Sequence, residues 1–137
     1  MTTVATPRAT STTSIATRTG RVLTGLVTAF LLFDAVIHVV NIAPVRDGAA
    51  TLGFDPDVIP LIGVLELVCL GLYVVRRTSP LGAVLLTGYL GGALCAQLRI
   101  DAPLFSALLF PVYIGVVVWA GLWLRDQRVR DVLTARR

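Results

Sequence analysis

The stretch RVLTGLVTAFLLFDAVIHVVNI, residues 21–42, is long and apolar enough to cross a lipid bilayer, yet it contains Asp34 and His38. A membrane helix needs about 20 mostly apolar residues to cross a hydrocarbon core about 30 Å thick. Placing an ionised side chain in that core costs roughly 3 kcal/mol, so such residues usually face a bundle interior or a cavity. The segment therefore predicts a membrane-spanning helix with a polar site on one face.

Three further apolar segments have the length of a span, at about residues 58–75, 79–100 and 104–124. The 137 residues are 55% hydrophobic and 15% charged, whereas a soluble domain averages about 25% charged. Short connections join neighbouring helices. We therefore predict an all-α integral membrane protein, a four-helix antiparallel bundle in contact with the lipid bilayer.

The flanking segments divide the chain into three parts. Residues 1–19 are rich in Thr, Ser and Ala and poor in large apolar groups, which predicts a disordered, uncleaved tail. Residues 20–126 form the predicted four-span domain, and within it residues 44–52 are expected to form a short interfacial helix. Residues 127–137 form a basic tail.

The basic residues indicate the orientation in the membrane. All 12 are arginines, and they cluster in the two tails and at Arg76 and Arg77, whereas the loop after the first span is net acidic. Because basic loops stay on the cytoplasmic side, both termini are predicted to be cytoplasmic. A nucleic-acid interface would need a basic face on a folded domain, so nucleic-acid binding is not expected.

Several local patterns predict how the spans begin and pack. Ser79 is suited to the N-cap of the third span, with Pro80 at its first helical position, and Pro111 is expected to interrupt the fourth. Cys69 and Cys95 form no CxxC motif. They are interpreted as small core residues.

A stripe of small residues, Gly88, Gly92 and Ala96, follows the third span at four-residue spacing. Such stripes let another helix backbone come close. We interpret this one as packing within the bundle, with a homodimer contact as the alternative.

The polar residues of the spans gather in the half that is predicted to face outward. Asp34, His38 and Asn41 are spaced i, i+4 and i+7, which places them on one face of the first span. Counted at about 1.5 Å per residue, Asp34 and Glu66 both lie about 12 Å from the outer ends of their helices. Asp34, His38 and Glu66 are therefore candidate catalytic residues that exchange protons. The candidate substrate-binding residues are Asn41, Tyr89, Gln97, Arg99 and Tyr113.

The cytoplasmic half is nearly all apolar, with Thr24, Thr28 and Thr87 as polar exceptions. This asymmetry predicts a pocket that opens outward rather than a continuous channel.

Structural explanations of the polar residues stay open. Asp34 and His38 can hydrogen-bond each other and fix helix packing, and Glu66 can pair with Arg99 or His38. Arg99, near a helix end, can also extend to the interface. The cluster holds three ligand-type side chains, but a single histidine without an HxxxH or ExxH pairing is a weak signal, so no metal site is predicted.

Five segments of this chain resemble the DoxX-like family: LLFDAVIH (31–38), LGF (52–54), IGVLEL (62–67), LLTGYLGGA (85–93) and WAGLWLRD (119–126). The resemblance implies a four-span bacterial membrane protein, some of whose relatives are subunits of quinone-linked oxidoreductases or associate with redox enzymes. Family members often carry His-Leu-Arg after the GGA block. This chain has Gln97-Leu98-Arg99 there, so a role of that histidine is not carried over, and His38 is the only imidazole.

Three functions are compatible with these features. The first is an enzyme or enzyme subunit in the bacterial cytoplasmic membrane, acting on a lipophilic quinone or isoprenoid, with a redox-enzyme partner. The second is a non-catalytic scaffold that binds a partner protein, and the third is a small proton-coupled transporter. The chain has no Walker, dinucleotide-binding or GxSxG motif, so those chemistries are not expected.

Overall fold

The computed structural model describes residues 15–134, and every regular element within them is helical. In chain order the elements are α1 (Ile15–Val40), α2 (Ala43–Thr51), η1 (Pro56–Val58), α3 (Ile59–Val74), α4 (Ser79–Leu98), η2 (Leu104–Leu108), α5 (Phe110–Arg125) and α6 (Gln127–Leu133). The η1 turn is a 3-10 helix that leads into α3, and η2 is a π-helical turn before α5. The predicted all-α class is confirmed for the described part of the chain.

Four helical segments are long and apolar enough to cross a membrane: Ile15–Val40, Pro56–Val74, Ser79–Leu98 and Leu104–Arg125. Large apolar side chains such as Leu26, Phe33 and Leu61 are more than half exposed on these helices. In water this surface would be unfavourable, but in a bilayer the surrounding lipid is equally apolar. The predicted four-span membrane bundle is therefore confirmed.

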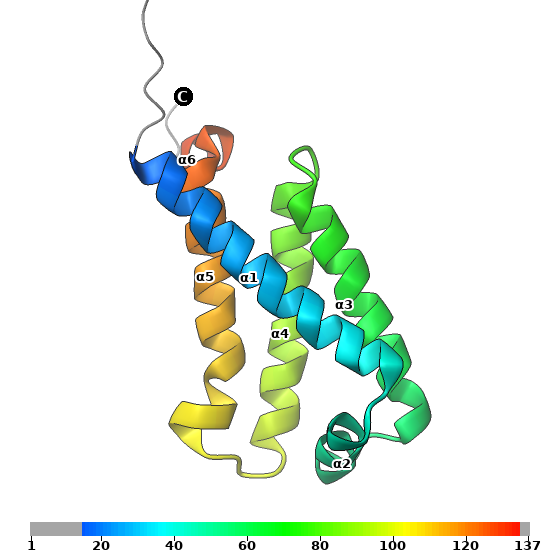
Figure 1. The fold of residues 1–137 in the computed structure, drawn as a ribbon. Helices are drawn as coiled ribbons and strands as arrows, with labels where there is room; N and C mark the ends of the chain where they lie inside the picture. The colour runs from blue at the N-terminus through cyan, green and yellow to red at the C-terminus, as the bar shows by residue number, and fades with distance from the viewer. Residues whose placement is uncertain (1–14, 135–137) are drawn as a thin grey trace, which may run out of the picture.

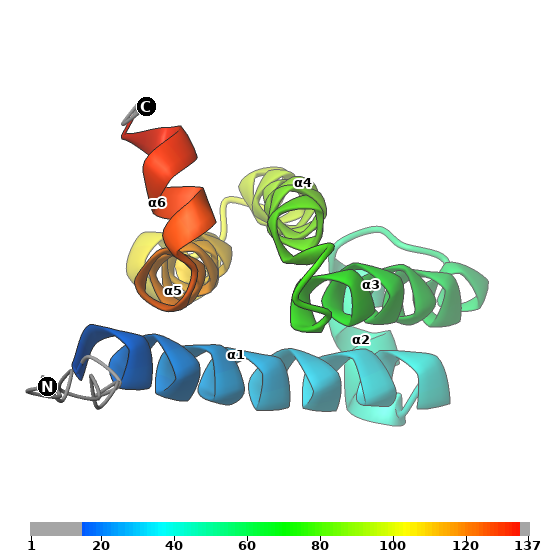
Figure 2. The ribbon, with the colours of Figure 1, turned by 90° about the horizontal axis from the view of Figure 1, so that it is seen from above.

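The spanning helices alternate in direction, and α1 crosses the others obliquely (Figure 1). α1 packs on α3 and α5, and α4 packs on the same two helices (Figure 2). A methyl group added at Gly20 would lie 2.7 Å from Leu124 Cβ of α5, and one added at Gly63 of α3 would lie 2.7 Å from the Val39 backbone nitrogen. α1 therefore contacts α5 near its beginning and α3 near its end.

The main apolar core lies toward the end of the bundle that holds the connection between α3 and α4. Leu31, Tyr73, Leu86, Val118 and Leu122 from all four spanning helices are at most 2% exposed and pack in one cluster. Tyr73 lies next to the end of α3, and the same cluster includes Ala83 of α4 and Val129 of α6, so the core lies nearer this end.

The small-residue stripe of α4 does not pack as predicted. A methyl group added at Gly88 or Gly92 would meet no atom within 4 Å, and both glycines are exposed, although Ala96 is buried. Cys69 is buried as predicted, but Cys95 is exposed. Since α4 is apolar on nearly all sides, its sequence does not mark which face turns toward the core.

Both predicted tails are partly helical. α1 begins at Ile15, inside the segment 1–19 that was predicted to be disordered, because Gly20 is buried against α5 and this contact supports the preceding turn. α6 occupies most of residues 127–137 and buries Val129. The remaining residues of both tails lie outside the described part of the chain.

The helix boundaries inside the membrane domain agree with the sequence except in two places. A short helix is present where one was predicted at residues 44–52, and it is α2. Ser79 is not an N-cap: it is the first residue of α4 after Thr78, and its hydroxyl donates instead to the Tyr73 carbonyl oxygen at 2.7 Å. Pro111 lies in the first turn of α5, where proline is tolerated, so the interruption falls earlier, at η2.

Candidate functional site

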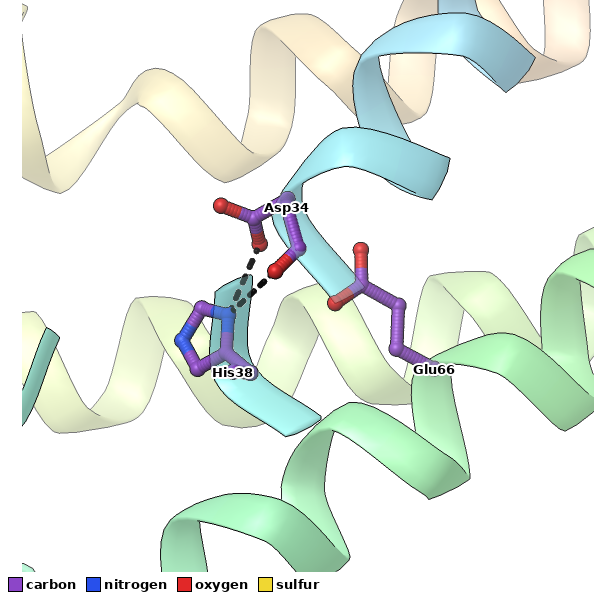
Figure 3. A group of neighbouring side chains, drawn as sticks. All are labelled: Asp34, His38 and Glu66. Carbon is purple, nitrogen blue, oxygen red and sulfur yellow. Dashed lines mark hydrogen bonds and ion pairs between the residues drawn. The ribbon is translucent and has the colours of Figure 1, made fainter. Parts of the chain in front are cut away.

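Asp34 and His38 of α1 meet Glu66 of α3, as their spacing and depth predict. One side-chain ligand atom of each residue lies within 4.8 Å of those of the other two. Figure 3 shows the Glu66 carboxyl group extending from α3 toward the two side chains of α1. We refer to these three residues as the acid–histidine cluster.

Gly63 explains why the two helices are close enough for this meeting. A methyl group added there would lie 2.8 Å from the Ala35 carbonyl oxygen and 2.9 Å from His38 Cβ, closer than real side chains pack. Glu66 follows Gly63 by three residues and therefore lies on the same face of α3. The missing side chain of Gly63 thus allows Glu66 to reach α1.

The backbone of α1 orients His38. The His38 Nδ1 atom lies 2.8 Å from the Asp34 carbonyl oxygen and 3.5 Å from Asp34 Oδ2. Because a carbonyl oxygen only accepts, Nδ1 carries the proton and donates it. In the neutral ring Nε2 is then an acceptor, and it has no hydrogen-bond partner among the described residues.

Glu66 is the buried member of the cluster, with no exposed surface. Tyr89 of α4 donates its hydroxyl to Glu66 Oε2 at 2.9 Å. Glu66 Oε1 is buried without a hydrogen-bond partner in the described structure. The carboxyl group is therefore fixed through one oxygen and left open at the other.

The remaining predicted binding residues lie apart from the cluster's hydrogen bonds. Asn41 follows the last residue of α1 in a left-handed conformation with φ 57°, and its Nδ2 donates to the Pro56 carbonyl oxygen at 3.2 Å. Gln97 and Arg99 lie at the end of α4 and form no hydrogen bond or ion pair with the cluster in the described residues. Tyr113, expected to face the bundle, is 46% exposed on α5. Among the predicted binding residues, Tyr89 alone bonds to the cluster.

A family model of the DoxX-like family matches residues 22–121, which is most of the chain. The chain belongs to the DoxX-like family. Comparison with curated proteins and with solved structures gives no match. The matched segment contains the complete acid–histidine cluster of this DoxX-like protein.

The opposite end of the DoxX-like bundle holds polar contacts that the sequence did not reveal. Arg125 Nη2 donates to the Tyr73 carbonyl oxygen at 3.0 Å and to Ser79 Oγ, and its guanidinium lies 5.0 Å from the centre of the Tyr73 ring. The Tyr73 hydroxyl donates to the Val118 carbonyl oxygen at 2.9 Å. We call Arg125, Tyr73 and Ser79 the closing network. Tyr73, a polar aromatic in an apolar span, was its only signal in the sequence.

Outside the spans, Asp126 fixes α6 to the bundle. Its Oδ1 accepts the Arg128 backbone N–H at 3.0 Å, and its Oδ2 lies 2.9 Å from Arg128 Nη2. The same guanidinium donates to the Arg76 carbonyl oxygen at 3.1 Å. The hydrogen bond from Arg128 lowers the pKa of the Asp126 carboxyl below its ordinary value. Asp126 is therefore ionised at neutral pH and caps α6.

Two cavities of this DoxX-like protein, of about 630 and 530 Å³, lie away from the acid–histidine cluster, and no residue of the cluster lines them. The cluster is instead accessible from the surface of the bundle, because the side chains of Asp34 and His38 are 33% and 23% exposed. Neither of these two cavities is the predicted pocket at the cluster.

Proposed function

We propose that this DoxX-like protein is a membrane-embedded enzyme, or a subunit of one, that transfers protons to and from a lipophilic small molecule of quinone or isoprenoid type. Asp34, His38 and Glu66 are the proposed catalytic residues, and Tyr89 is a positioning residue that holds Glu66. The single observation that carries the proposal is the buried Glu66 Oε1. This oxygen has no hydrogen-bond partner in the described structure, although Glu66 lies close to Asp34 and His38.

An unpaired buried oxygen needs an explanation. Leaving a buried acceptor without a hydrogen bond costs roughly 1–3 kcal/mol, and native structures contain few such groups. A hydroxyl or carbonyl head group against Glu66 Oε1 would complete the cluster, by donating a hydrogen bond or by accepting one from the protonated acid. The neighbouring Asp34 carboxyl can satisfy this oxygen only by sharing a proton with it. A head group that donates or accepts there would replace that contact, so the open oxygen supports ligand binding.

The position of the cluster favours a ligand that arrives through the bilayer. Asp34 lies six residues before the end of α1, or about 9 Å along the helix. Asp34 and His38 are partly exposed there, while the surrounding α1 side chains Phe33 and Val36 are apolar and exposed. A molecule with an apolar tail and an oxygen-bearing head suits this environment.

The hydrogen bonds suggest a division of roles. Tyr89 holds Glu66 Oε2, so Oε1 is the oxygen that exchanges a proton with the ligand. His38 and Asp34, which are partly exposed, would return that proton to the outside. Reduction of a quinone to a quinol also takes two electrons, which a redox-protein partner would supply.

The arginine distribution supports a placement in the bacterial cytoplasmic membrane with both termini in the cytoplasm. Arg76 and Arg77, between α3 and α4, lie at the same end of the bundle as the first turns of α1 and as α6 (Figure 1). Basic loops are retained on the cytoplasmic side. The acid–histidine cluster would then belong to the outer half, where Asn41, Gln97 and Arg99 are available to a larger head group.

A second candidate function is a non-catalytic scaffold that binds a partner protein through α6. It is favoured by the anchoring of α6, which buries Val129 and is capped by Asp126. A helix held this firmly outside the membrane domain offers a defined surface to a partner.

The proposal is tested by purifying the full chain in mild detergent and identifying co-purified lipophilic molecules by mass spectrometry. In Glu66→Gln the amide retains an acceptor for Tyr89 but loses the carboxyl chemistry. We expect a quinone-type or isoprenoid-type molecule in the wild type and about tenfold less in the variant, as for the loss of one hydrogen bond to a charged group.

A matched pair of tyrosine variants serves as the control. Tyr89→Phe frees Glu66 Oε2 and should also reduce the bound ligand, whereas Tyr113→Phe changes an exposed tyrosine and should not. If wild type and Glu66→Gln were equally empty and equally stable, the ligand-binding proposal would be wrong. The scaffold function would then be preferred.

A further inference from the structure

The cavity of about 630 Å³ is a groove between α4 and α5, and none of its lining residues belongs to α1 or α3. Along α5 it extends from Pro111 to Trp123, or about 18 Å at 1.5 Å per residue. One leaflet of a bilayer contributes about half of a 30 Å hydrocarbon core. The groove is therefore long enough to lie along an acyl chain of one leaflet.

Glycines keep the groove open. A methyl group added at Gly91 would meet no atom within 4 Å, and one added at Gly115 would meet only a Leu90 methyl at 3.7 Å. Both glycines line the groove together with apolar side chains such as Leu94 and Val116. In a protein that spans a membrane, a lipid-facing apolar groove is filled by hydrocarbon rather than by water.

The groove leads to a polar recess at α6. This second cavity, of about 530 Å³, is lined by Trp123, Gln127, Arg130, Asp131 and Thr134. Trp123 lines both cavities, so the apolar groove and the polar recess adjoin at this residue. Tryptophan is enriched where hydrocarbon meets head groups.

The charged side chains of the recess lack the partners that the other charged side chains near α6 have. Arg125 bonds to Tyr73 and Ser79, and Arg128 bonds to Asp126. Arg130 and Asp131, by contrast, take part in no side-chain ion pair within residues 15–134. The recess thus offers one cation and one carboxylate at the end of an apolar groove.

We propose that this groove and recess bind one phospholipid whose head group carries both a phosphate and a primary ammonium group, as in phosphatidylethanolamine. One acyl chain lies along Gly91 and Gly115, the phosphate pairs with Arg130, and the ammonium group pairs with Asp131. The charge complementarity selects this lipid: a purely anionic head group would offer Asp131 no cationic partner, and a trimethylammonium group could not donate a hydrogen bond to it. This site is separate from the acid–histidine cluster and does not depend on its function.

The two tryptophans of the chain, Trp119 and Trp123, both line the groove, so their fluorescence reports its occupancy directly. The full chain is reconstituted in bilayers of phosphatidylcholine with brominated acyl chains, which quench tryptophan. Unbrominated phosphatidylethanolamine, phosphatidylglycerol or phosphatidylcholine is then added to relieve the quenching. We expect phosphatidylethanolamine to relieve the quenching at a mole fraction about fivefold lower than phosphatidylglycerol or phosphatidylcholine requires. This factor corresponds to one interfacial charge contact.

Variants assign this selectivity to the recess and the groove. Arg130→Gln should raise the mole fraction at which each of the three lipids relieves the quenching, because all three carry a phosphate, and Asp131→Asn should abolish the advantage of phosphatidylethanolamine over phosphatidylglycerol. Gly91→Leu should fill the groove and reduce quenching, whereas Gly88→Leu, at a glycine of α4 that does not line the groove, should not. Arg77→Gln is the matched charge control on the exposed loop.

Three results would overturn the proposal. If the three lipids relieved the quenching of the wild type at equal mole fractions, only ordinary surrounding lipid would contact the tryptophans. Unchanged quenching in Gly91→Leu would show that the groove is not the binding site. Weak quenching at every lipid composition, together with cross-linking of two chains through α4, would show that a second copy of this protein covers the groove.

Discussion

The two ends of this bundle differ in how many hydrogen bonds their buried ionisable side chains form. In the closing network, Arg125 Nη2 donates to the Tyr73 carbonyl oxygen and to Ser79, although the buried Arg125 Nε has no hydrogen-bond partner in the described structure. In the acid–histidine cluster, a fully buried carboxyl group keeps one oxygen without a partner. A satisfied network stabilises a fold, whereas an unsatisfied acceptor destabilises it. The comparison teaches that the first set holds the helices together, while the second is suited to binding something else.

The largest effect on stability is expected from Arg125→Gln. The variant removes charged hydrogen bonds and the contact with the Tyr73 ring, and hydrogen bonds to charged groups contribute about 1.5–3 kcal/mol. We expect the free energy of unfolding in detergent to fall by about 2 kcal/mol, measured by thermal unfolding. Arg77→Gln, which changes an exposed arginine, should leave it nearly unchanged. If both variants were equally stable, Arg125 would not stabilise the fold, and the closing network would not differ from the acid–histidine cluster in this respect.

Gly63→Ala should destabilise the fold and also separate the cluster. The added methyl group would lie 2.7 Å from the Val39 nitrogen, so α3 and α1 must move apart, at a cost of about 1–3 kcal/mol. Any ligand that depends on Glu66 meeting Asp34 should be lost with it, as mass spectrometry would show. Gly71→Ala is the control on the same helix, since a methyl group there meets nothing within 4 Å. Retention of the ligand in Gly63→Ala would contradict the site.

Asp126→Ala should loosen α6 alone. Loss of an N-cap costs about 1 kcal/mol, so amide hydrogen exchange in residues 127–133 should become about fivefold faster at neutral pH. Asp126→Asn retains an oxygen for the Arg128 N–H, so its exchange rate should lie between those of Asp126→Ala and the wild type.

The pH dependence follows from the lowered pKa of Asp126, whose main cause is the hydrogen bond from Arg128. A carboxyl whose pKa is lower in the folded state stabilises at pH values above its unfolded pKa of about 3.9. That stabilisation is lost as the pH falls through the folded pKa. The wild type should therefore approach Asp126→Asn in exchange rate only below about pH 4, and convergence at pH 6 would be inconsistent with this pairing.

The smallest change in stability is expected from Glu66→Gln, and it is the most informative one. Because Glu66 Oε1 has no partner, replacing the carboxyl should leave the free energy of unfolding unchanged or raise it slightly. The melting temperature of the purified variant measures this. A loss as large as that of Arg125→Gln would mean that Glu66 is a structural residue like those of the closing network.

Much of this arrangement could be predicted from the sequence because it depends on length and spacing. Four apolar segments predict four spans, and the i, i+4 spacing of Asp34 and His38 with the depth of Glu66 predicts their meeting. The closing network could not be predicted, since Arg125 and Tyr73 are 52 positions apart and their contact depends on how each helix is rotated. The same rotation decides why Gly63 packs closely and Gly88 does not. In helices that are apolar on every side, hydropathy does not distinguish the face toward protein from the face toward lipid.

The oblique course of α1 separates its two close contacts, with α5 at Gly20 and with α3 at Gly63 (Figure 1). The helix rests on α5 at Gly20 and carries Asp34 about 21 Å further along, beside α3. A rotation of roughly 5° about the Gly20 contact would displace Asp34 by about 2 Å, comparable to the difference between a hydrogen bond and none. Since long spans adjust their tilt to the thickness of the bilayer, the separation of Asp34 from Glu66 would respond to acyl-chain length, while the contact between Gly20 and Leu124 would stay in place.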